Sequence, residues 1–415
     1  MAEATKIHDI HQPPSSQITL DELLREGARR LLQSAIEQEV AAYIDAHATE
    51  LDEDGHRLVV RNGRAPARNL QTGVGPIPVT RPRVDDRRVD EDGNRLRFES
   101  ALLPPYLRRS KSIEELLPWL YLKGISTGDF SEALQALVGA DAPGLSASTI
   151  VRLKKCWEED FAAWTKRSLA GKRYVYMWAD GIHCNVRLED GKPCILVVMG
   201  ATEDGTKELV AVEDGVRESE QSWKEVLLDL KARGLEAGPE LMIADGALGL
   251  WKAVPQVWPE ARHQRCWFHK SGNVLNKVPK SVQPKMKKAL QEIWQAETRV
   301  AATTAFDLFI SKFEAKYGKA TACLEKDRVE LLAFFDFPAE HWKHLRTTNP
   351  IESTFATVRL RTTRTKGAGS RSACLAMVFK LAQAAERKWR KLDGHDLLGD
   401  VIRGVIFKDG IKAAA

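Results

Sequence analysis

Residues 174–181 read Tyr174-Val175-Tyr176-Met177-Trp178-Ala179-Asp180-Gly181, and residues 241–245 read Leu241-Met242-Ile243-Ala244-Asp245. Each is a short apolar run that ends in an aspartate, which is typical of a buried β-strand. Further strands are predicted at 182–188, 194–202, 208–212 and 263–267, with helices at 220–233 and 248–254. The order strand, strand, strand, helix, strand, helix, strand predicts an α/β layer fold.

This order of elements is the one expected of a ribonuclease-H-like core, which we assign to 171–272. From 274 to about 342 the periodicity is helical and the strand pattern does not resume. We therefore predict an all-helical insertion at 273–345. Helices at 351–360 and 372–392 then complete the core over 346–392, and 393–415 is predicted to be a C-terminal tail.

Upstream of residue 171 the chain is expected to be mainly helical. Residues 1–17 form a predicted flexible tail. A unit at 18–110 follows, and its first helix is opened by a capping box that Thr19 makes with Glu22. Within this unit, Ile77, Val79 and Val84 suggest only short edge strands. In 111–170, helices are expected at 113–122, 129–137 and 148–164. A turn at Ala142-Pro143-Gly144 gives this region a helix-turn-helix outline, and Arg152, Lys154 and Lys155 are candidate DNA-binding residues on its last helix. This segment alone favours an ordinary three-helix bundle.

Composition limits the class of protein. The 415 residues include 62 Lys plus Arg and 57 Asp plus Glu, a formal net charge of +5, and 43% are hydrophobic. These values exclude collagen, coiled-coil and wholly disordered chains and indicate two or three domains. The longest apolar run, Cys194 to Ala201, is shorter than the ~18 residues that a spanning helix needs. Six cysteines form no regular framework and the N-terminus lacks a secretory pattern, so a reducing, cytoplasmic setting is expected.

Three acidic residues are the candidate catalytic and metal-binding groups. Asp180 and Asp245 follow buried strands, where a carboxylate is costly unless it is hydrogen-bonded or bound to a cation. Glu352 follows Asn349-Pro350, a helix-start signature, and therefore lies in a first helical turn. Taken singly, Asp180-Gly181 also fits a hairpin turn and Glu352 an ordinary helix-start acid. Together the three could converge on two Mg²⁺ or Mn²⁺ ions for phosphoryl displacement.

The stretch after Glu352 is strongly basic. Between residues 359 and 391 ten Lys and Arg residues are opposed only by Glu386. Such an excess is the pattern expected for contact with a nucleic-acid backbone. The candidate DNA-binding residues here are Arg359, Arg361, Arg364, Lys366 and Arg371.

Cys266 and His269 form a Cys-x-x-His pair that allows two interpretations. With His341 and His344 the pair could bind zinc, but the long separation and the aromatic residues between Cys266 and His269 make this a non-standard zinc pattern. A structural role, closing a strand against the core, is the favoured interpretation from the residues alone.

Four blocks of sequence carry a resemblance to a known family. They are 178–181 (WADG), 243–246 (IADG), 264–270 (QRCWFHK) and 347–353 (TTNPIES), with further similarity from Ala101-Leu102-Leu103 to Gly124-Ile125-Ser126. The chain resembles the bacterial insertion-sequence transposases of the Mutator type, relatives of the plant Mutator element, over most of its length.

The resemblance implies a catalytic DDE triad of Asp180, Asp245 and Glu352 that holds two Mg²⁺ or Mn²⁺ ions and needs no nucleotide cofactor. It implies an N-terminal region that recognises terminal inverted repeats, and a helical insertion before the glutamate. Cys266 and His269 would be signature residues near the active site. The implied partners are double-stranded DNA, both element ends and target, and at least one further copy of the chain, with no membrane. A circular, copy-out intermediate and a nucleoid-associated setting in a bacterial cytoplasm complete the expectation.

Two other functions remain open from the residues. A metal-dependent, structure-specific nuclease of the same fold would cleave DNA without joining it. A non-catalytic DNA-binding regulator would need only the helix-turn-helix. The intact set of three acids favours an enzyme over the regulator.

Overall fold

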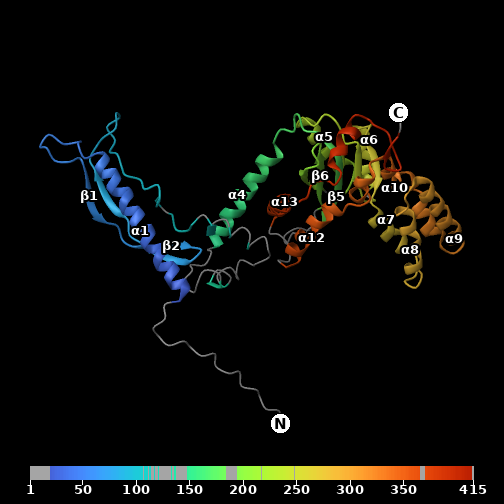
Figure 1. Ribbon diagram of the computed structural model, residues 1–415, viewed down its shortest axis with the longest axis horizontal. Coiled ribbons are helices and arrows are strands. Elements are labelled where there is room, and N and C mark those ends of the chain that lie inside the picture. Colours follow the sequence, from blue (N-terminus) through green and yellow to red (C-terminus); the bar gives the residue numbers. More distant parts are fainter. Residues whose placement is uncertain are drawn as a thin grey trace, which may run out of the picture. The chain divides into compact units, whose positions relative to one another are not determined.

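The structure is a computed structural model that describes residues 19–105, 107–110, 112–113, 116, 120, 132, 135–136, 147–183, 194–215, 217–246, 248–364 and 370–413. The chain divides into two compact units, Met1–Ile150 and Val151–Ala415 (Figure 1). The finer domain boundaries expected from the sequence remain predictions, and the predicted flexible tail at 1–17 lies outside the described residues. No helix in the described part of the chain is long and apolar enough to cross a membrane.

The first unit is built on the helix α1 (Leu20–Ala46). The predicted capping box is confirmed, since Thr19 Oγ1 accepts a hydrogen bond from Glu22 N and the Glu22 carboxylate accepts one from Thr19 N. Two antiparallel hairpin-like pairs lie beside it, β1 (Val59–Arg64) with β4 (Pro82–Asp86) and β2 (Arg68–Thr72) with β3 (Gly75–Val79). A small core joins α1 through Ile36 to Leu70, Ile77 and Val79.

About half of the predicted helix-turn-helix at 111–170 lies outside the described residues, including its turn. Its last helix is confirmed as α4 (Ala147–Thr165). The C-terminal half of α4 packs on α13 (Arg371–Glu386), where the ring centroids of Trp164 and Phe379 are 4.9 Å apart. α4 is therefore fastened to the second unit from about Phe161 onward.

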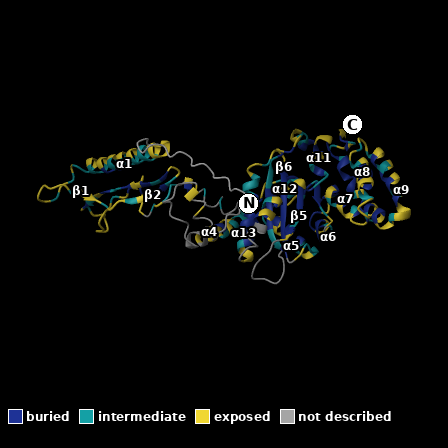
Figure 2. Cartoon of the chain, turned by 90° about the horizontal axis from the view of Figure 1, so that it is seen from below, coloured by how far each residue is buried: buried dark blue, intermediate teal, exposed yellow. Residues whose placement is uncertain are grey.

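A five-stranded mixed sheet forms the centre of the second unit, in the order β7-β6-β5-β8-β9. Its strands are β5 (Tyr174–His183), β6 (Cys194–Thr202), β7 (Lys207–Gly215), β8 (Leu241–Ala244) and β9 (Arg262–Arg265). β5, β6 and β7 pair antiparallel, whereas β8 and β9 run parallel to β5. The chain is therefore a mixed α/β protein whose central strands are buried, as the dark blue of β5 and β6 in Figure 2 shows.

Alternate residues of β5 face different layers, because side chains of a strand alternate across the sheet. Met177 and Ala179 join the core beneath α5 (Glu220–Ala232) and α6 (Leu248–Val257). Tyr176 and Trp178 face the opposite layer, where Tyr176 contacts His341 and Trp178 Nε1 donates to the carbonyl oxygen of His344. This alternation places Asp180 in the same layer as His341 and His344.

The predicted break after Asp180 is wrong. Asp180 and Gly181 lie inside β5, which continues to His183, so there is no hairpin turn at Asp180-Gly181 and no separate strand beginning at Ile182. The reason is pairing: β6 supplies hydrogen-bonding partners along the whole of β5, from Tyr174 opposite Thr202 to His183 opposite Cys194. The remainder of the predicted strand at 182–188 lies outside the described residues.

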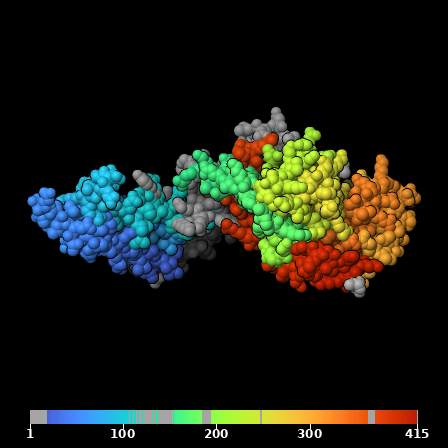
Figure 3. All heavy atoms as spheres, turned by 90° about the horizontal axis from the view of Figure 1, so that it is seen from above, coloured from blue at the N-terminus to red at the C-terminus, as the bar shows by residue number. Residues whose placement is uncertain are grey.

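The segment after β9 is helical, as predicted, and Figure 3 shows its later part in orange at one end of the second unit. It contains α7 (Trp267–Leu275), α8 (Gln283–Trp294), α9 (Arg299–Glu325), α10 (Arg328–Leu331) and α11 (Trp342–Leu345). The strand predicted at 263–267 ends earlier, at Arg265, because Cys266 is the N-cap residue of α7. α12 (Asn349–Arg364) and α13 follow; α13 ends at Glu386, before the predicted Leu392.

The structure corrects the prediction of a C-terminal tail, because the described residues 393–413 are folded. They form α14 (Leu398–Ile402) and a hairpin of β10 (Phe407–Lys408) and β11 (Ile411–Lys412). Arg299 N donates to Asp409 Oδ1 at 2.6 Å, and Gly410 N donates to Phe335 O at 3.2 Å. The hairpin is therefore tied to the helical segment by bonds that no periodicity in so short a stretch could indicate.

His344 gives the second unit a testable dependence on pH. Its Nε2 accepts a hydrogen bond from Asp393 N at 3.2 Å, which requires a neutral ring. Burial, followed by the charges of Lys207 and Lys343, lowers the pKa of His344 to about 4 from its ordinary 6.5. Between the ordinary pKa of 6.5 and the lowered value of about 4, the folded protein therefore binds fewer protons than the unfolded chain. His344 lowers the free energy of unfolding as the pH falls through this range.

Between pH 7 and pH 4.5, we expect the free energy of unfolding to fall by about 2–3 kcal/mol more in the wild type than in His344→Gln. Urea unfolding at the two pH values, followed by tryptophan fluorescence, measures this difference. Glutamine retains a hydrogen-bond acceptor but does not titrate. The comparison with the variant is needed because burial raises the pKa of Glu213 to about 7, and such an acid acts in the opposite direction. Equal pH dependence in both proteins would refute the assignment.

Candidate active site and nucleic-acid contacts

The structure brings Asp180 and Asp245 together at neighbouring positions of the sheet. β5 and β8 are parallel with Ala179 opposite Ala244, so the next residue of each chain segment is an aspartate at the same level. The Cα atoms of such neighbours lie about 5 Å apart. Asp180 is only 7% exposed. The predicted convergence of the two aspartates is therefore observed.

Two side chains hold the backbone of Asp245. Its carbonyl oxygen accepts hydrogen bonds from Arg265 NH1 at 2.7 Å and from Trp251 Nε1 at 2.9 Å. Both donors come from the elements that follow β8 in the sequence, α6 and β9. The chain that leaves β8 is thus fixed on two sides before α6 begins.

Glu352 lies in the first turn of α12, as predicted from Asn349-Pro350. α12 packs against β5, the strand that carries Asp180. Thr348 Oγ1, fully buried, donates a hydrogen bond to Glu352 Oε1 at 2.7 Å. The position at the N-terminus of the helix also favours the ionised carboxylate.

Cys266 and His269 meet Glu352 rather than His341 and His344. The ligand atoms of Cys266, His269 and Glu352 all lie within 4.8 Å of one another, and His269 Nδ1 is 3.7 Å from Glu352 Oε1. His341 is occupied elsewhere, with Nδ1 2.8 Å from the Tyr176 hydroxyl and Nε2 2.8 Å from a backbone carbonyl oxygen. The structure therefore offers no support for the four-residue zinc site.

Thr348 connects the Cys-x-x-His pair to the glutamate. Its backbone N donates to Cys266 Sγ at 3.3 Å, and Cys266 N donates to Ala244 O at 2.8 Å, one residue before Asp245. Oγ1 carries a single proton, and the shorter distance and the negative charge favour the bond to Glu352 over the 3.4 Å contact with Cys266 Sγ. Through these two hydrogen bonds, the buried Cys266 links the chain that leads into Glu352 to the strand that precedes Asp245.

The pKa values of Asp180 and His269 are both raised at this site. Burial, and then the nearby charge of Asp245, raises the pKa of Asp180 to about 7, while His269 acts in the opposite direction. The pKa of His269 is raised to about 9, first by its hydrogen bond with Cys266 and then by Glu352 and Asp180. His269 therefore lies close to both acids, and its protonated ring offsets part of their negative charge.

Glu218 is a fourth acid at this site, and sequence reasoning missed it. Burial and the charge of Asp245 raise its pKa. A Cβ on Gly181 would lie 2.2 Å from Glu218 Oε1, so glycine after Asp180 leaves room for this carboxylate. Glu218 precedes Ser219, the N-cap residue of α5. Acids near helix starts are common, so nothing in the local pattern distinguishes this one.

A buried group of charges lies beneath α7. Asp327 forms ion pairs with Lys270 and with Arg265 NH2, the latter at 3.2 Å, and all three residues are less than 10% exposed. Lys270 Nζ also donates to Cys323 O at 2.9 Å. Because Arg265 holds the carbonyl oxygen of Asp245 as well, this group ties the chain after β8 to the helical segment.

The predicted DNA-binding residues of α4 are exposed where the structure describes them. Arg152 and Lys155 are exposed, and the side chain of Lys154 lies outside the description. Contact with DNA through these residues remains a prediction.

The basic stretch after Glu352 is not one open surface. Arg359 is exposed, but Arg361 is only 2% exposed and belongs to the interior. Arg371 NH1 forms an ion pair with Asp214 at 3.0 Å. The side chain of Arg364 and the whole of Lys366 lie outside the described residues. The number of basic residues in the sequence therefore overestimated the number of exposed, unpaired cations in this stretch. Sequence alone does not show which cations are buried or form ion pairs.

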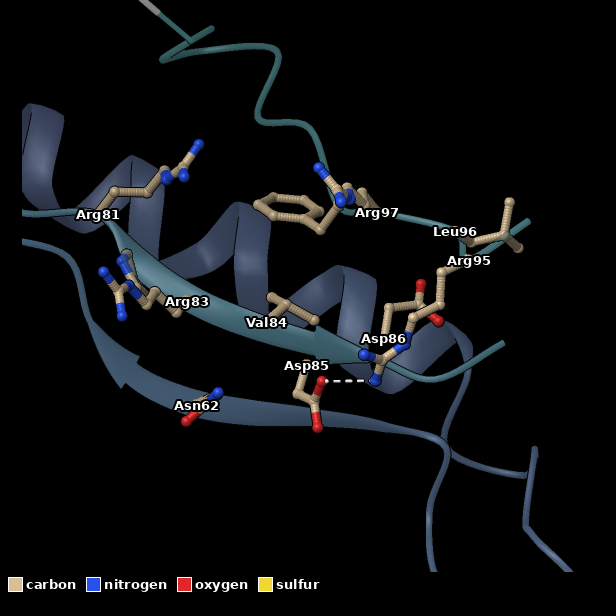
Figure 4. Close-up of a pocket in the computed structure, with 11 residues that line it drawn as sticks. Asn62, Arg81, Arg83, Val84, Asp85, Asp86, Arg95, Leu96 and Arg97 are labelled. Atoms are coloured by element: carbon tan, nitrogen blue, oxygen red, sulfur yellow. Dashed lines mark hydrogen bonds and ion pairs between the residues drawn. The ribbon is translucent and has the colours of Figure 1, made fainter. Parts of the chain in front are cut away.

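Arginines also gather in the first unit, around a pocket of about 330 Å³ between β4 and the chain at 95–98. Figure 4 shows Arg81, Arg83 and Arg97 around this pocket, while Arg95 turns to Asp85, with which it pairs at 3.2 Å. Within the described chain, no ion pair holds Arg83 or Arg97. Such a cluster is suited to a phosphate group.

Comparison with known proteins gives matches over most of the chain. The family model "Transposase, Mutator family" matches residues 1–392. The chain is 52% identical over 298 residues to the transposase for insertion sequence element IS6120 of Mycolicibacterium smegmatis, covering 72% of this chain and 92% of that protein. It is also 52% identical over 289 residues to the transposase for insertion sequence element IST2 of Acidithiobacillus ferrooxidans, covering 68% and 95%. A solved Drosophila P element transposase strand transfer complex matches at 11% identity, covering 71% of this chain and 91% of that one, with a TM-score of 0.23, which is too low to bear on the fold.

Proposed function

Because the chain belongs to the Mutator family of transposases, we propose that it binds the terminal inverted repeats of an insertion sequence and cuts and joins DNA at one site made by Asp180, Asp245 and Glu352. The observation that carries the proposal is the register of β5 and β8, which sets two aspartates side by side, while α12, whose first turn carries Glu352, packs against β5. Both named relatives are transposases of insertion sequences.

The proposal includes a ribonuclease-H-like core. Its support is the strand order β7-β6-β5-β8-β9, with three antiparallel strands followed by two parallel ones and helices between the parallel strands. This is the order expected of such a core from the sequence. The helical segment between β9 and α12 would then be an insertion within it.

The donor set fits divalent cations. Carboxylate oxygens are the ligands that Mg²⁺ and Mn²⁺ prefer, and burial, followed by the charge of Asp245, raises the pKa of Asp180, so a bound cation would stabilise its ionised form. Asp180, Asp245 and Glu352 would hold two such ions, which supply Lewis-acid stabilisation of the attacking and leaving oxygens. Thr348 would orient the Glu352 carboxylate by its hydrogen bond, and Arg265 would fix the backbone of Asp245.

The reaction proceeds in two displacements. Water attacks a phosphodiester at the element end, breaks the bond to the 3′ oxygen and leaves a free 3′-hydroxyl and a 5′-phosphate. The 3′-hydroxyl then attacks a second phosphodiester, and the new bond replaces the broken one without ATP. The protein contributes position and a fixed charge environment, and no side chain forms a covalent bond to DNA.

The DNA partners extend beyond the catalytic site. The first unit, with its arginine pocket, would grip the phosphates of the inverted repeat, and α4 would add Arg152 and Lys155. Two element ends must be brought together, so at least two copies of the chain would act on DNA. Joining one end to the other of the same element would give a circular intermediate.

The direct test is a joining assay with purified protein, labelled element-end DNA, plasmid target and Mg²⁺. We expect nicked ends and, in addition, label covalently joined to plasmid. Cleavage without joined product would favour a nuclease, and neither product, with binding intact, would favour a regulator. Either result contradicts the proposal.

Removing the Thr348 hydroxyl should slow the reaction. Thr348→Val keeps the shape of the side chain but deletes the hydrogen bond to Glu352, and partners that orient a metal ligand are worth about 10- to 100-fold in activity. We expect a fall in kcat of that size with little change in KM for DNA, and recovery by Thr348→Ser. If Thr348→Ser is as slow as Thr348→Val, the hydroxyl is not the group that matters.

Removing two arginines of the first unit should weaken DNA binding in a salt-dependent way. Arg83→Ala with Arg97→Ala removes two cations, and for every phosphate that is no longer neutralised the slope of log affinity against log salt falls by about 0.9. Fluorescence anisotropy at several salt concentrations measures the slope. The control is Arg30→Ala, which deletes an exposed cation paired with Glu26 on α1. An unchanged slope in the double variant would contradict phosphate binding at this pocket.

A further inference from the structure

A second cavity lies beside the catalytic acids, in the second unit. It has a volume of about 580 Å³ and opens between α7, α8 and the chain that leads into α12. Sites for organic ligands typically have volumes of about 300–1,000 Å³. The cavity is therefore large enough for a planar group of the size of a nucleobase.

The cavity adjoins the candidate active site. His269 and Asn349 are part of its wall. His269 Nδ1 lies 3.7 Å from Glu352 Oε1, and Asn349 is three residues before Glu352 on the same helix. A DNA strand held at the acids would therefore lie close to this cavity.

The walls are aromatic. Phe268 is 61% exposed although its neighbour Trp267 is buried, and its ring meets that of His269 edge to face at a centroid distance of 5.7 Å. Trp294 of α8 lines another part of the wall. An exposed phenylalanine next to a catalytic centre offers a surface on which a base can stack.

The polar groups of the cavity suit the edges of a base. Asn273 and Gln291 line it and contribute amides that can both donate and accept hydrogen bonds. Asn273 Nδ2 also lies near the loop after Asp245, since a Cβ on Gly246 would be 3.7 Å from it. Lys287 adds a cation, and none of the described residues that line the cavity is acidic. This combination matches a nucleotide and not a cationic ligand.

We propose that this cavity receives one base of the element-end DNA, unstacked from the duplex beside the phosphate that is cut, with the base stacking on Phe268. The inference rests on the proposed function and adds a binding site to it. Unstacking draws the strand away from its partner, which lets the acids reach a phosphate that the duplex would otherwise present at a fixed angle. Stacking on Phe268 and hydrogen bonds from Asn273 and Gln291 offset the cost of unpairing.

The test combines a protein variant with a change in the DNA. Element-end duplexes are prepared with a single abasic site, moved one nucleotide at a time across the cleavage point, and each is cut by the wild type and by Phe268→Ala. On fully paired DNA we expect Phe268→Ala to be about 10- to 100-fold slower, the effect of removing one base-stacking surface. At one abasic position the two proteins should cut at nearly equal rates, because the base that Phe268 contacts is gone.

Two further variants keep the result interpretable. Phe268→Trp should retain the wild-type rate, since it preserves a stacking surface. Leu308→Ala, at an apolar residue of α9 that is also largely exposed, should show no loss on any DNA. If Phe268→Ala is not slower on paired DNA, or is slower by the same factor at every abasic position, the cavity does not hold a base. If the wild type cuts none of the duplexes, the proposed function itself fails.

Discussion

Asp245→Asn is expected to lower the rate of DNA cleavage by a factor on the order of 10³ or more, because an amide cannot supply the charge that holds a divalent cation and several kcal/mol of transition-state stabilisation are lost. Asp180→Asn and Glu352→Gln should behave in the same way. Each variant should still bind element-end DNA, since the cations proposed to grip phosphates lie elsewhere. Cleavage and joining are measured on gels, and DNA binding by anisotropy.

A buried acid outside the site provides the control for these three variants. Glu213 lies on β7, and burial raises its pKa to about 7, as it does for Asp180. Glu213→Gln should leave the rate within about threefold of the wild type. Robust activity in any one of the three active-site variants, or an equal loss in Glu213→Gln, would contradict the assignment of the triad.

The second large effect concerns stability. Asp327→Ala leaves Lys270 and Arg265 as buried, unpaired cations, and breaking such a pair costs about 3–5 kcal/mol. One of the two side chains that hold the backbone of Asp245 should also be held less firmly, because Arg265 bonds both Asp327 and Asp245. We expect urea unfolding to show a loss of that size in the free energy of unfolding. We also expect reduced DNA cleavage, even at temperatures where the variant is folded.

A surface pair on the same helical segment is the matched control for Asp327. Asp307 pairs with Arg328 at 2.7 Å, and its side chain is 60% exposed. Asp307→Ala should cost about 0–1 kcal/mol. A loss below about 1 kcal/mol for Asp327→Ala would show that the buried charges are not coupled as the structure implies.

The parts of the fold that sequence predicted well are those set by local pattern. The apolar runs before Asp180 and Asp245 form β5 and β8, and Asn349-Pro350 opens the helix that carries Glu352. These three signals predicted the elements on which the acids lie, because strand burial and helix start are properties of a few adjacent residues.

Features set by interactions between distant residues were missed. β5 continues through Gly181 because β6 pairs with it, although Asp-Gly alone favours a turn. Glu218 reaches the site from the start of α5 only because Gly181 has no side chain. The hydrogen bond from Thr348 N to Cys266 Sγ crosses 82 residues of sequence, and no spacing rule indicates it.

The most direct test of the central claim is a crystal structure of the protein with precleaved element-end DNA and Mn²⁺, recorded at the manganese absorption edge. We predict two anomalous peaks among the carboxylates of Asp180, Asp245 and Glu352, next to the 3′-hydroxyl of the DNA. Peaks absent from these carboxylates, or a metal held by Cys266 and His269 without the aspartates, would contradict the account.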